Sequence, residues 1–169
     1  MSTPLKKVVD DQVEASAMAA ELLNADDAEY VAAGVRKVLS SLRARRVWEN
    51  HVGPIFTHKQ ALEATGWSKQ YLSQAVKENR VLRLRAADGT TSGYWSGGLT
   101  DTVPHRPIAG IKEVLTAWIS AAADPWTVAS WMSTEQMELG GRTPRAALVA
   151  GEVPDVAALA RRMAERLSA

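Results

Sequence analysis

Side chains that can hydrogen-bond to the edges of DNA bases gather between Ser68 and Asn79. In a helix over this range, the apolar residues at 72, 75 and 76 fall on one side and form the face that must pack on the protein. The opposite side carries amide, hydroxyl and ammonium groups, on Lys69, Gln70, Ser73, Gln74 and Lys77. Glutamine can pair with adenine, lysine can reach guanine or a phosphate, and serine can bond to either. The pattern predicts a helix that reads the major groove of double-stranded DNA.

Local signals predict the helix-turn-helix that would hold this segment. Thr57 and Gln60 have the spacing of a capping box, which opens a first helix, and Gly66 ends it. Ser68 then caps the reading helix after a short turn, an arrangement typical of tri-helical DNA-binding domains. We expect Thr57 and the first amides of its helix to meet a phosphate, and we count Ser68 among the DNA-contacting residues.

The chain changes to a strand-like period after Asn79. Arg83 and Arg85 alternate with apolar neighbours, Asp88 and Gly89 supply hairpin chemistry, and residues 90–95 are again β-prone. We therefore expect a short β-wing. Arg83 and Arg85 are predicted to contact a neighbouring stretch of backbone or the minor groove.

The distribution of charge favours a polyanionic partner. The chain has a net charge of only +1, but residues 1–30 carry −5, residues 31–106 carry +7 and residues 107–169 carry −1. A basic block between acidic or neutral ones is typical of a nucleic-acid-binding segment in a protein that is not basic throughout. Within this block, Arg43, Arg45 and Arg46 fit a DNA contact and a solvated helix face equally well.

The expected fold is mainly α, a helical bundle with a winged helix-turn-helix plus a small all-α C-terminal domain. Residues 6–23 have the composition of a helix. In the next predicted helix, four apolar residues that follow one another at steps of four, three and four share one face. We expect residues 1–95 to form the DNA-binding domain, residues 96–107, with two Gly and two Pro, to be a linker, and residues 108–169 to form a helical interaction domain. The four residues on the shared face are Val31, Val35, Val38 and Leu42.

Two stretches resemble known families. The runs Phe56-Thr57-His58-Lys59-Gln60-Ala61-Leu62 and Gly66-Trp67-Ser68-Lys69-Gln70 resemble the DNA-binding part of actinobacterial helix-turn-helix regulators. A second set, Trp131, Leu139-Gly140-Gly141-Arg142-Thr143-Pro144, Ala147-Leu148 and Gly151, resembles the toxin-binding domain of Xre/ParS-type antitoxins. This resemblance implies a C-terminal domain that binds and inhibits a toxin while the N-terminal domain represses the operon. It implies partner contacts by Trp131, Gly141, Arg142 and Thr143.

The sequence offers little for enzyme chemistry, and we expect no cofactor and no metal. The absence of cysteine excludes thiolate zinc sites and cysteine nucleophiles. His51 and His58, separated by a Gly-Pro break, lack a recognised ligand spacing. No apolar run approaches the roughly 18 residues needed to cross a membrane, and residues 1–10 lack the apolar stretch of a signal peptide, so we expect a cytoplasmic protein.

Two classes of function stay open at this point. The chain is either a sequence-specific repressor, free-standing, phage-borne or the antitoxin of a toxin pair, or a helical protein-interaction module whose basic block is incidental. Trp118, Trp126 and Trp131 fit a core, a partner interface or a homodimer interface. Tyr71 and Trp95 are predicted to be core residues rather than base-stacking platforms.

Overall fold

The structure is a computed structural model that describes residue 7 and residues 25–86 and 92–168. The chain divides into two compact units, Met1–Arg45 and Arg46–Ala169. The predicted helix over residues 6–23 and the predicted hairpin turn at Asp88 and Gly89 fall largely or wholly outside the described residues. None of the described helices is both long and apolar enough to cross a membrane.

Helix α2 (Ala25–Val52) provides nearly all of what is described of the first unit. The sequence places four apolar side chains on one face of this helix, and all four are exposed. The last turns of α2 belong to the second unit, where Val52 is buried in the core.

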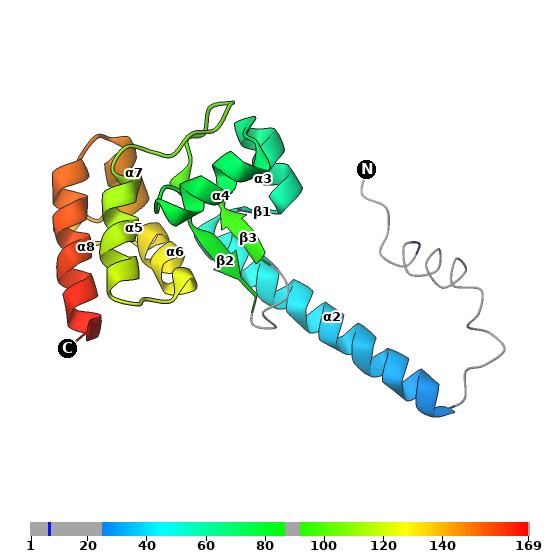
Figure 1. The fold of residues 1–169 in the computed structure, drawn as a ribbon. Coiled ribbons are helices and arrows are strands. Elements are labelled where there is room, and N and C mark those ends of the chain that lie inside the picture. The colour runs from blue at the N-terminus through cyan, green and yellow to red at the C-terminus, as the bar shows by residue number, and fades with distance from the viewer. Residues whose placement is uncertain (1–6, 8–24, 87–91, 169) are drawn as a thin grey trace. The chain divides into compact units, whose positions relative to one another are not determined.

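The second unit contains the predicted winged helix-turn-helix (Figure 1). Its elements run in the order β1 (Ile55–Phe56), α3 (His58–Thr65), α4 (Lys69–Lys77), β2 (Arg83–Arg85) and β3 (Ser92–Trp95). The three strands form an antiparallel sheet in the order β1-β3-β2, with Ile55 opposite Trp95 and Leu84 opposite Gly93. Strand β1 is an addition to the predicted hairpin.

The helix boundaries around the turn follow the predicted capping residues. The Thr57 hydroxyl accepts the Gln60 amide hydrogen, and the Gln60 side chain accepts the Thr57 amide hydrogen, which closes the capping box. Gly66 ends α3 in the left-handed region at φ 68°, and the Ser68 side chain caps α4. Local side-chain chemistry therefore sets where α3 stops and α4 starts.

The rest of the second unit is helical, with a 3-10 turn η1 (Ser96–Gly98) followed by α5 (Ile111–Ser120) and α6 (Pro125–Ser133). A second 3-10 turn η2 (Met137–Leu139), α7 (Pro144–Val149) and α8 (Val153–Ser168) complete it. Asp124 and Thr143 cap α6 and α7, and each is followed by a proline in the first turn. The fold class is thus mainly α with a small antiparallel sheet, as predicted.

The larger hydrophobic core is shared between the sheet and the C-terminal helices. It contains Leu84 and Trp95 from the sheet together with Trp118 and Leu148 from α5 and α7. The smaller core holds α4 against α3 and β3 through Leu72, Ala61 and Tyr94 among others. The two faces of the sheet therefore support different groups of helices.

Residues 96–107, predicted to be a linker, lie within the second unit and are hydrogen-bonded to several other parts of it. Leu99 and Pro107 form an isolated bridge, and the His105 amide donates to the Ala64 carbonyl at the end of α3. Arg145 of α7 donates to the Gly97 carbonyl and pairs with Asp101 at 2.6 Å. The division between the two compact units lies at Arg45–Arg46 instead, far from the predicted boundary.

Candidate nucleic-acid interface

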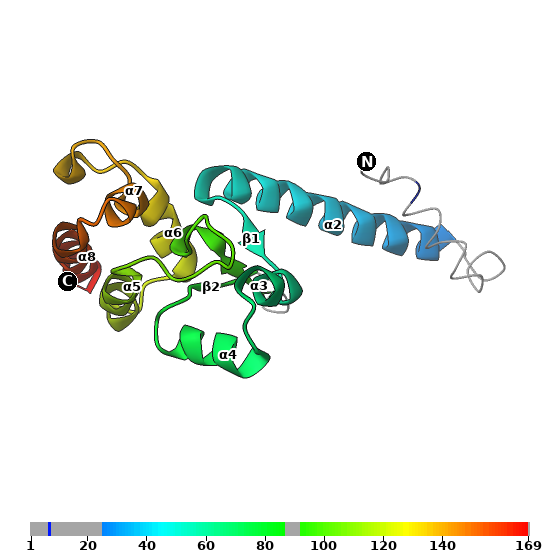
Figure 2. The ribbon, with the colours of Figure 1, turned by 90° about the horizontal axis from the view of Figure 1, so that it is seen from above.

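Helix α4 presents the predicted polar face to solvent. Leu72 and Ala75 are buried against the smaller core and Val76 is half-buried beside them. Figure 2 shows α4 at the edge of the second unit. The predicted reading residues Lys69, Gln70, Ser73, Gln74 and Lys77 are all exposed. The helix thus has the two-sided character that a groove-reading helix requires.

A hydrogen-bonded network fixes the side chain of Gln74. Its Nε2 donates to Glu78 Oε1 at 2.8 Å, and Arg80 Nε donates to Glu78 Oε2 at 2.7 Å. Hydrogen bonds from Gln74 and from Arg80 lower the pKa of the Glu78 carboxyl, so it is ionised at neutral pH. An ionised carboxylate only accepts hydrogen bonds, so the Gln74 amide nitrogen must face it and the Gln74 carbonyl oxygen turns elsewhere.

Asn79 and Arg80 follow the C-terminal end of α4 and make side-chain contacts there. Asn79 has a left-handed backbone at φ 58°, which asparagine tolerates better than most residues, and its side chain donates to Thr116 of α5. The Arg80 guanidinium lies over the Tyr71 ring, 5.1 Å from its centroid, and donates to the Tyr71 hydroxyl at 3.4 Å. Sequence reasoning missed Arg80 because its part in the network depends on this backbone turn.

Tyr71 is not a core residue, in contrast to the prediction. Its side chain is 48% exposed, because its position on α4 lies at the border of the buried stripe. The ring meets Trp67 edge-on with centroids 4.7 Å apart, and Arg106 lies over Trp67 at 5.9 Å. Two adjacent aromatic rings, Tyr71 and Trp67, therefore lie between the guanidinium groups of Arg80 and Arg106. This composition suits a nucleic-acid backbone and its bases.

Trp95, in contrast, is a core residue as predicted. Its side chain is 1% exposed, and its Nε1 donates to the Val52 carbonyl at 2.7 Å. A Cβ on Gly97 would lie 2.4 Å from the Trp95 ring, so only glycine fits there. Trp95 thereby ties the end of α2 to the sheet that carries the wing.

The wing places both predicted arginines in solvent. Arg83 and Arg85 are exposed on β2, while Leu84 between them is buried. The Arg83 guanidinium donates to the Ser92 hydroxyl on β3, which orients it along the sheet. Trp126 of α6 donates its indole N–H to the Arg85 carbonyl at 2.7 Å, so a C-terminal helix braces the wing strand.

The last turns of α2 pack on the same helix α6. The rings of Trp48 and Trp126 lie 5.2 Å apart, and His51 Nε2 is hydrogen-bonded to the Ser130 hydroxyl at 2.9 Å. His58 is bonded to the Tyr94 hydroxyl at 3.0 Å. In the described part of the chain, no three His, Cys, Asp or Glu side chains gather as a metal site would require.

Thr57 and Ser68 lie at the N-termini of α3 and α4, where both are exposed. Each hydroxyl accepts a backbone amide hydrogen of its own helix, so capping is the established part of its role. The backbone N–H of Thr57 also donates a hydrogen bond, to the Gln60 side chain. A phosphate at this end of α3 would therefore meet the amides that follow Thr57.

Of the four residues predicted to contact a partner, Trp131 lies in α6, and Gly141, Arg142 and Thr143 lie in the segment that leads to α7. Trp131 is only 7% exposed and packs on Trp118 with centroids 5.2 Å apart. Gly141 adopts φ 75° in the turn, and Thr143 caps α7. Only Arg142 of the four is exposed. Gly141 and Thr143 therefore shape the turn before α7, Trp131 belongs to the core, and Arg142 is the one of the four that a partner could touch.

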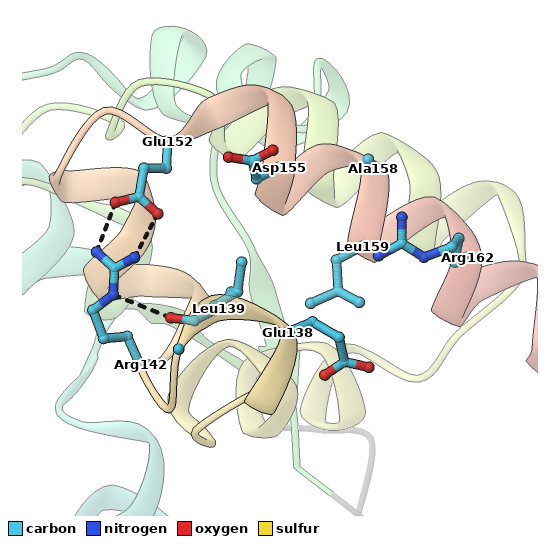
Figure 3. Close-up of a pocket in the computed structure, with 9 residues that line it drawn as sticks. Glu138, Leu139, Arg142, Glu152, Asp155, Ala158, Leu159 and Arg162 are labelled. Carbon is cyan, nitrogen blue, oxygen red and sulfur yellow. Dashed lines mark hydrogen bonds and ion pairs between the residues drawn. The ribbon is translucent and has the colours of Figure 1, made fainter.

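The Arg142 side chain is hydrogen-bonded to two neighbouring residues. Its two terminal nitrogens donate to the two carboxylate oxygens of Glu152 at 2.7 Å each, and its Nε donates to the Leu139 carbonyl (Figure 3). Hydrogen bonds from Arg142 lower the pKa of Glu152, and those to Glu152 raise the pKa of Arg142. The pair borders a hollow of about 290 Å³ that Glu138, Asp155 and Arg162 also line.

Comparison with known proteins adds a likeness in fold. No family model matches the chain, and no curated protein matches it. Among solved structures, the NMR structure of Rv2175c is similar to 66% of this chain and 81% of that chain, with 20% sequence identity and a TM-score of 0.53. At this level of identity the likeness shows the fold alone.

Proposed function

We propose that the chain is a sequence-specific regulator, a repressor, that binds double-stranded DNA with α4 in the major groove. The observation that carries the proposal is the exposed polar face of α4, on which Gln74 is held by Glu78 in one orientation. A glutamine whose orientation is already fixed loses less side-chain entropy on binding a base. The positive charge of residues 31–106 supports the same partner.

The residues would divide between reading and positioning. Gln70 and Gln74 lie on the part of α4 opposite its buried stripe, and their amides suit adenine. Lys69, Ser73 and Lys77 flank them and would bind guanine or phosphate. On the wing, Arg83 and Arg85 would hold the neighbouring backbone, which adds affinity without selecting a sequence.

Binding to a library of random duplexes tests this proposal. The full chain should enrich a common site, and binding of that site and a shuffled duplex is then measured by fluorescence anisotropy over a salt series. Replacing Gln70 and Gln74 together by Ala should reduce the preference for the selected site by about 5-fold to 150-fold for each base pair read. The salt dependence should stay the same, because neither residue neutralises a phosphate.

Matched variants distinguish recognition of the base sequence from electrostatic attraction to the phosphates. Arg83→Ala should weaken binding to both duplexes alike and lower the salt slope, whereas replacing the exposed Arg161 of α8 by Ala should change neither. Equal binding of both duplexes by the unmodified chain would reject a regulator. It would leave the alternative of a protein-interaction module with an incidental basic block.

The C-terminal helices support a second candidate function, binding of a partner protein, with a toxin as the partner that the antitoxin resemblance implies. The hollow beside α8 presents Glu138, Asp155 and Arg162 together (Figure 3). Arg162→Glu should weaken binding of a toxin partner, while the ion pair between Arg142 and Glu152 stays in place. A toxin complex that is unaffected would argue against this surface.

A further inference from the structure

Helix α2 carries an apolar stripe that is open to solvent. Val31, Val35, Val38 and Leu42 are 50%, 44%, 59% and 41% exposed. Large aliphatic side chains at steps of four, three and four residues form the seam of a paired helix. A contiguous exposed stripe of this kind marks an interaction surface.

The stripe is symmetric about its own midpoint. Steps of four, three and four are the same in either direction, and the centre falls between Arg36 and Lys37. If a second α2 runs antiparallel, Val31 lies opposite Leu42 of the second copy and Val35 lies opposite Val38. Each copy then offers the same surface to the other, which is the condition for a closed two-fold interface.

Two small residues lie beside the stripe on α2. These residues, Gly34 and Ser41, lie on one side of it. A Cβ on Gly34 would meet nothing within 4 Å, so no contact with the described residues requires glycine at this exposed helical position. Glycine weakens a helix interior, but it permits a close approach of a second backbone.

The charges of α2 favour the antiparallel direction over the parallel one. Arg36, Lys37, Arg43 and Arg46 are exposed and lie at the middle and C-terminal end of the helix, whereas Glu29 is exposed near its start. Parallel pairing would set equal residues side by side and bring the Arg-rich ends together. Antiparallel pairing separates those ends and places each near the acidic start of the other helix.

We infer that a second copy of this chain covers the stripe, so that the protein is a homodimer joined by antiparallel α2 helices. The inference does not depend on DNA binding, because every measurement below is made without DNA. The full chain should sediment with a concentration-dependent mass that rises from 18.3 kDa toward twice that value.

Charge substitutions locate the interface. Val35→Glu should raise the dimer dissociation constant by roughly 100-fold, since it places a carboxylate in the apolar seam twice per dimer. Ser40→Glu, on the opposite side of the helix, should leave the constant unchanged. Circular dichroism of both variants checks that the helix content is retained. A chain that is monomeric at all concentrations, or a dimer that Val35→Glu does not weaken, would overturn the inference.

Disulfide trapping determines the direction, because the chain has no cysteine of its own. A mixture of Val31→Cys and Leu42→Cys chains should form a cross-linked heterodimer on oxidation. Val31→Cys alone should not, because in the antiparallel register its two copies are 11 positions apart, about 16 Å along the helix. Rapid cross-linking of Val31→Cys alone would show a parallel pair and refute the assignment.

Discussion

Replacement of Trp95 by Phe should be far more damaging than the same replacement at Trp118. Both side chains are almost fully buried, at 1% and 2% exposure, and both belong to the larger core. They differ in one respect. The Trp95 indole N–H donates to the buried Val52 carbonyl, whereas the Trp118 indole N–H has no hydrogen-bond partner among the described residues.

The magnitudes follow from this difference. Each replacement removes the same ring atoms, and the resulting cavity costs about 1 kcal/mol. At Trp95 the Val52 carbonyl is also left buried without its donor, which costs about 1–3 kcal/mol more. At Trp118 the replacement removes an unsatisfied buried N–H, which offsets the cavity. We expect Trp95→Phe to destabilise by about 2–4 kcal/mol and Trp118→Phe by about 1 kcal/mol or less.

Thermal unfolding followed by circular dichroism at 222 nm measures both variants. At about 4 °C per kcal/mol for a unit of this size, Trp95→Phe should lower Tm by about 10 °C and Trp118→Phe by less than about 4 °C. Equal destabilisation by the two replacements would refute the reasoning, because it would mean that the hydrogen bond to Val52 has no measurable weight.

The remaining predictions concern the pH response, base reading and the wing. The low pKa of Glu152, caused by hydrogen bonds from Arg142, means that this pair stabilises the fold above the ordinary value of 4.5 and that the contribution is lost as the pH falls below it. Glu152→Gln should remove that part of the pH dependence of Tm, and an unchanged profile would contradict it. Glu78→Gln should relax the base preference at the position read by Gln74 without altering the salt slope, as site selection would show; an unaltered preference would mean that Glu78 does not orient Gln74. Trp126→Phe should weaken DNA binding a few-fold for every sequence, because strand β2 loses the hydrogen bond from the Trp126 indole. Anisotropy with the selected and shuffled duplexes measures this, and a loss of affinity for only one of the two duplexes would contradict the prediction.

The parts of the fold that depend on neighbouring residues could be predicted from the sequence. The capping box of Thr57 and Gln60, the left-handed Gly66 and the Ser68 cap all act within a few residues. Helix α3 begins and ends, and α4 begins, where these signals place them, whereas α4 ends at Lys77, before the expected Asn79. The exposed face of α4 follows from the helical period in the same way. These features were accessible because the interactions that produce them are local.

Features that depend on distant partners were not predicted. Strand β1 is two residues long, and it exists through pairing with Trp95 and Tyr94 about 40 residues later. The extra residues of the candidate site have the same origin. Arg80 reaches Glu78, the partner of Gln74, after a left-handed backbone turn at Asn79, and Tyr71 lies at the exposed border of the stripe that the smaller core covers.

Composition misled the prediction for residues 96–107. Two Gly and two Pro are typical of a linker, but here Gly97 makes room for the Trp95 ring, and the backbone is bonded to α3 and α7. Glycine and proline report on backbone geometry, and a close approach of a side chain to the backbone, as at Gly97, requires glycine just as a loop can.

The core that Leu84 and Trp95 share with Trp118 and Leu148 limits how such a chain can evolve or be engineered. A gene fusion cut at residues 96–107 would not deliver an independent N-terminal half, because it would strip one face of the sheet of its covering and expose both halves to aggregation and proteolysis. Under the proposed function, exchanging the exposed residues Gln70 and Gln74 would change the sequence preference with far less disruption of the fold. If α4 reads DNA as proposed, variation in target choice should therefore arise by point substitution on this one helix, with the remainder of the second unit inherited as a single block.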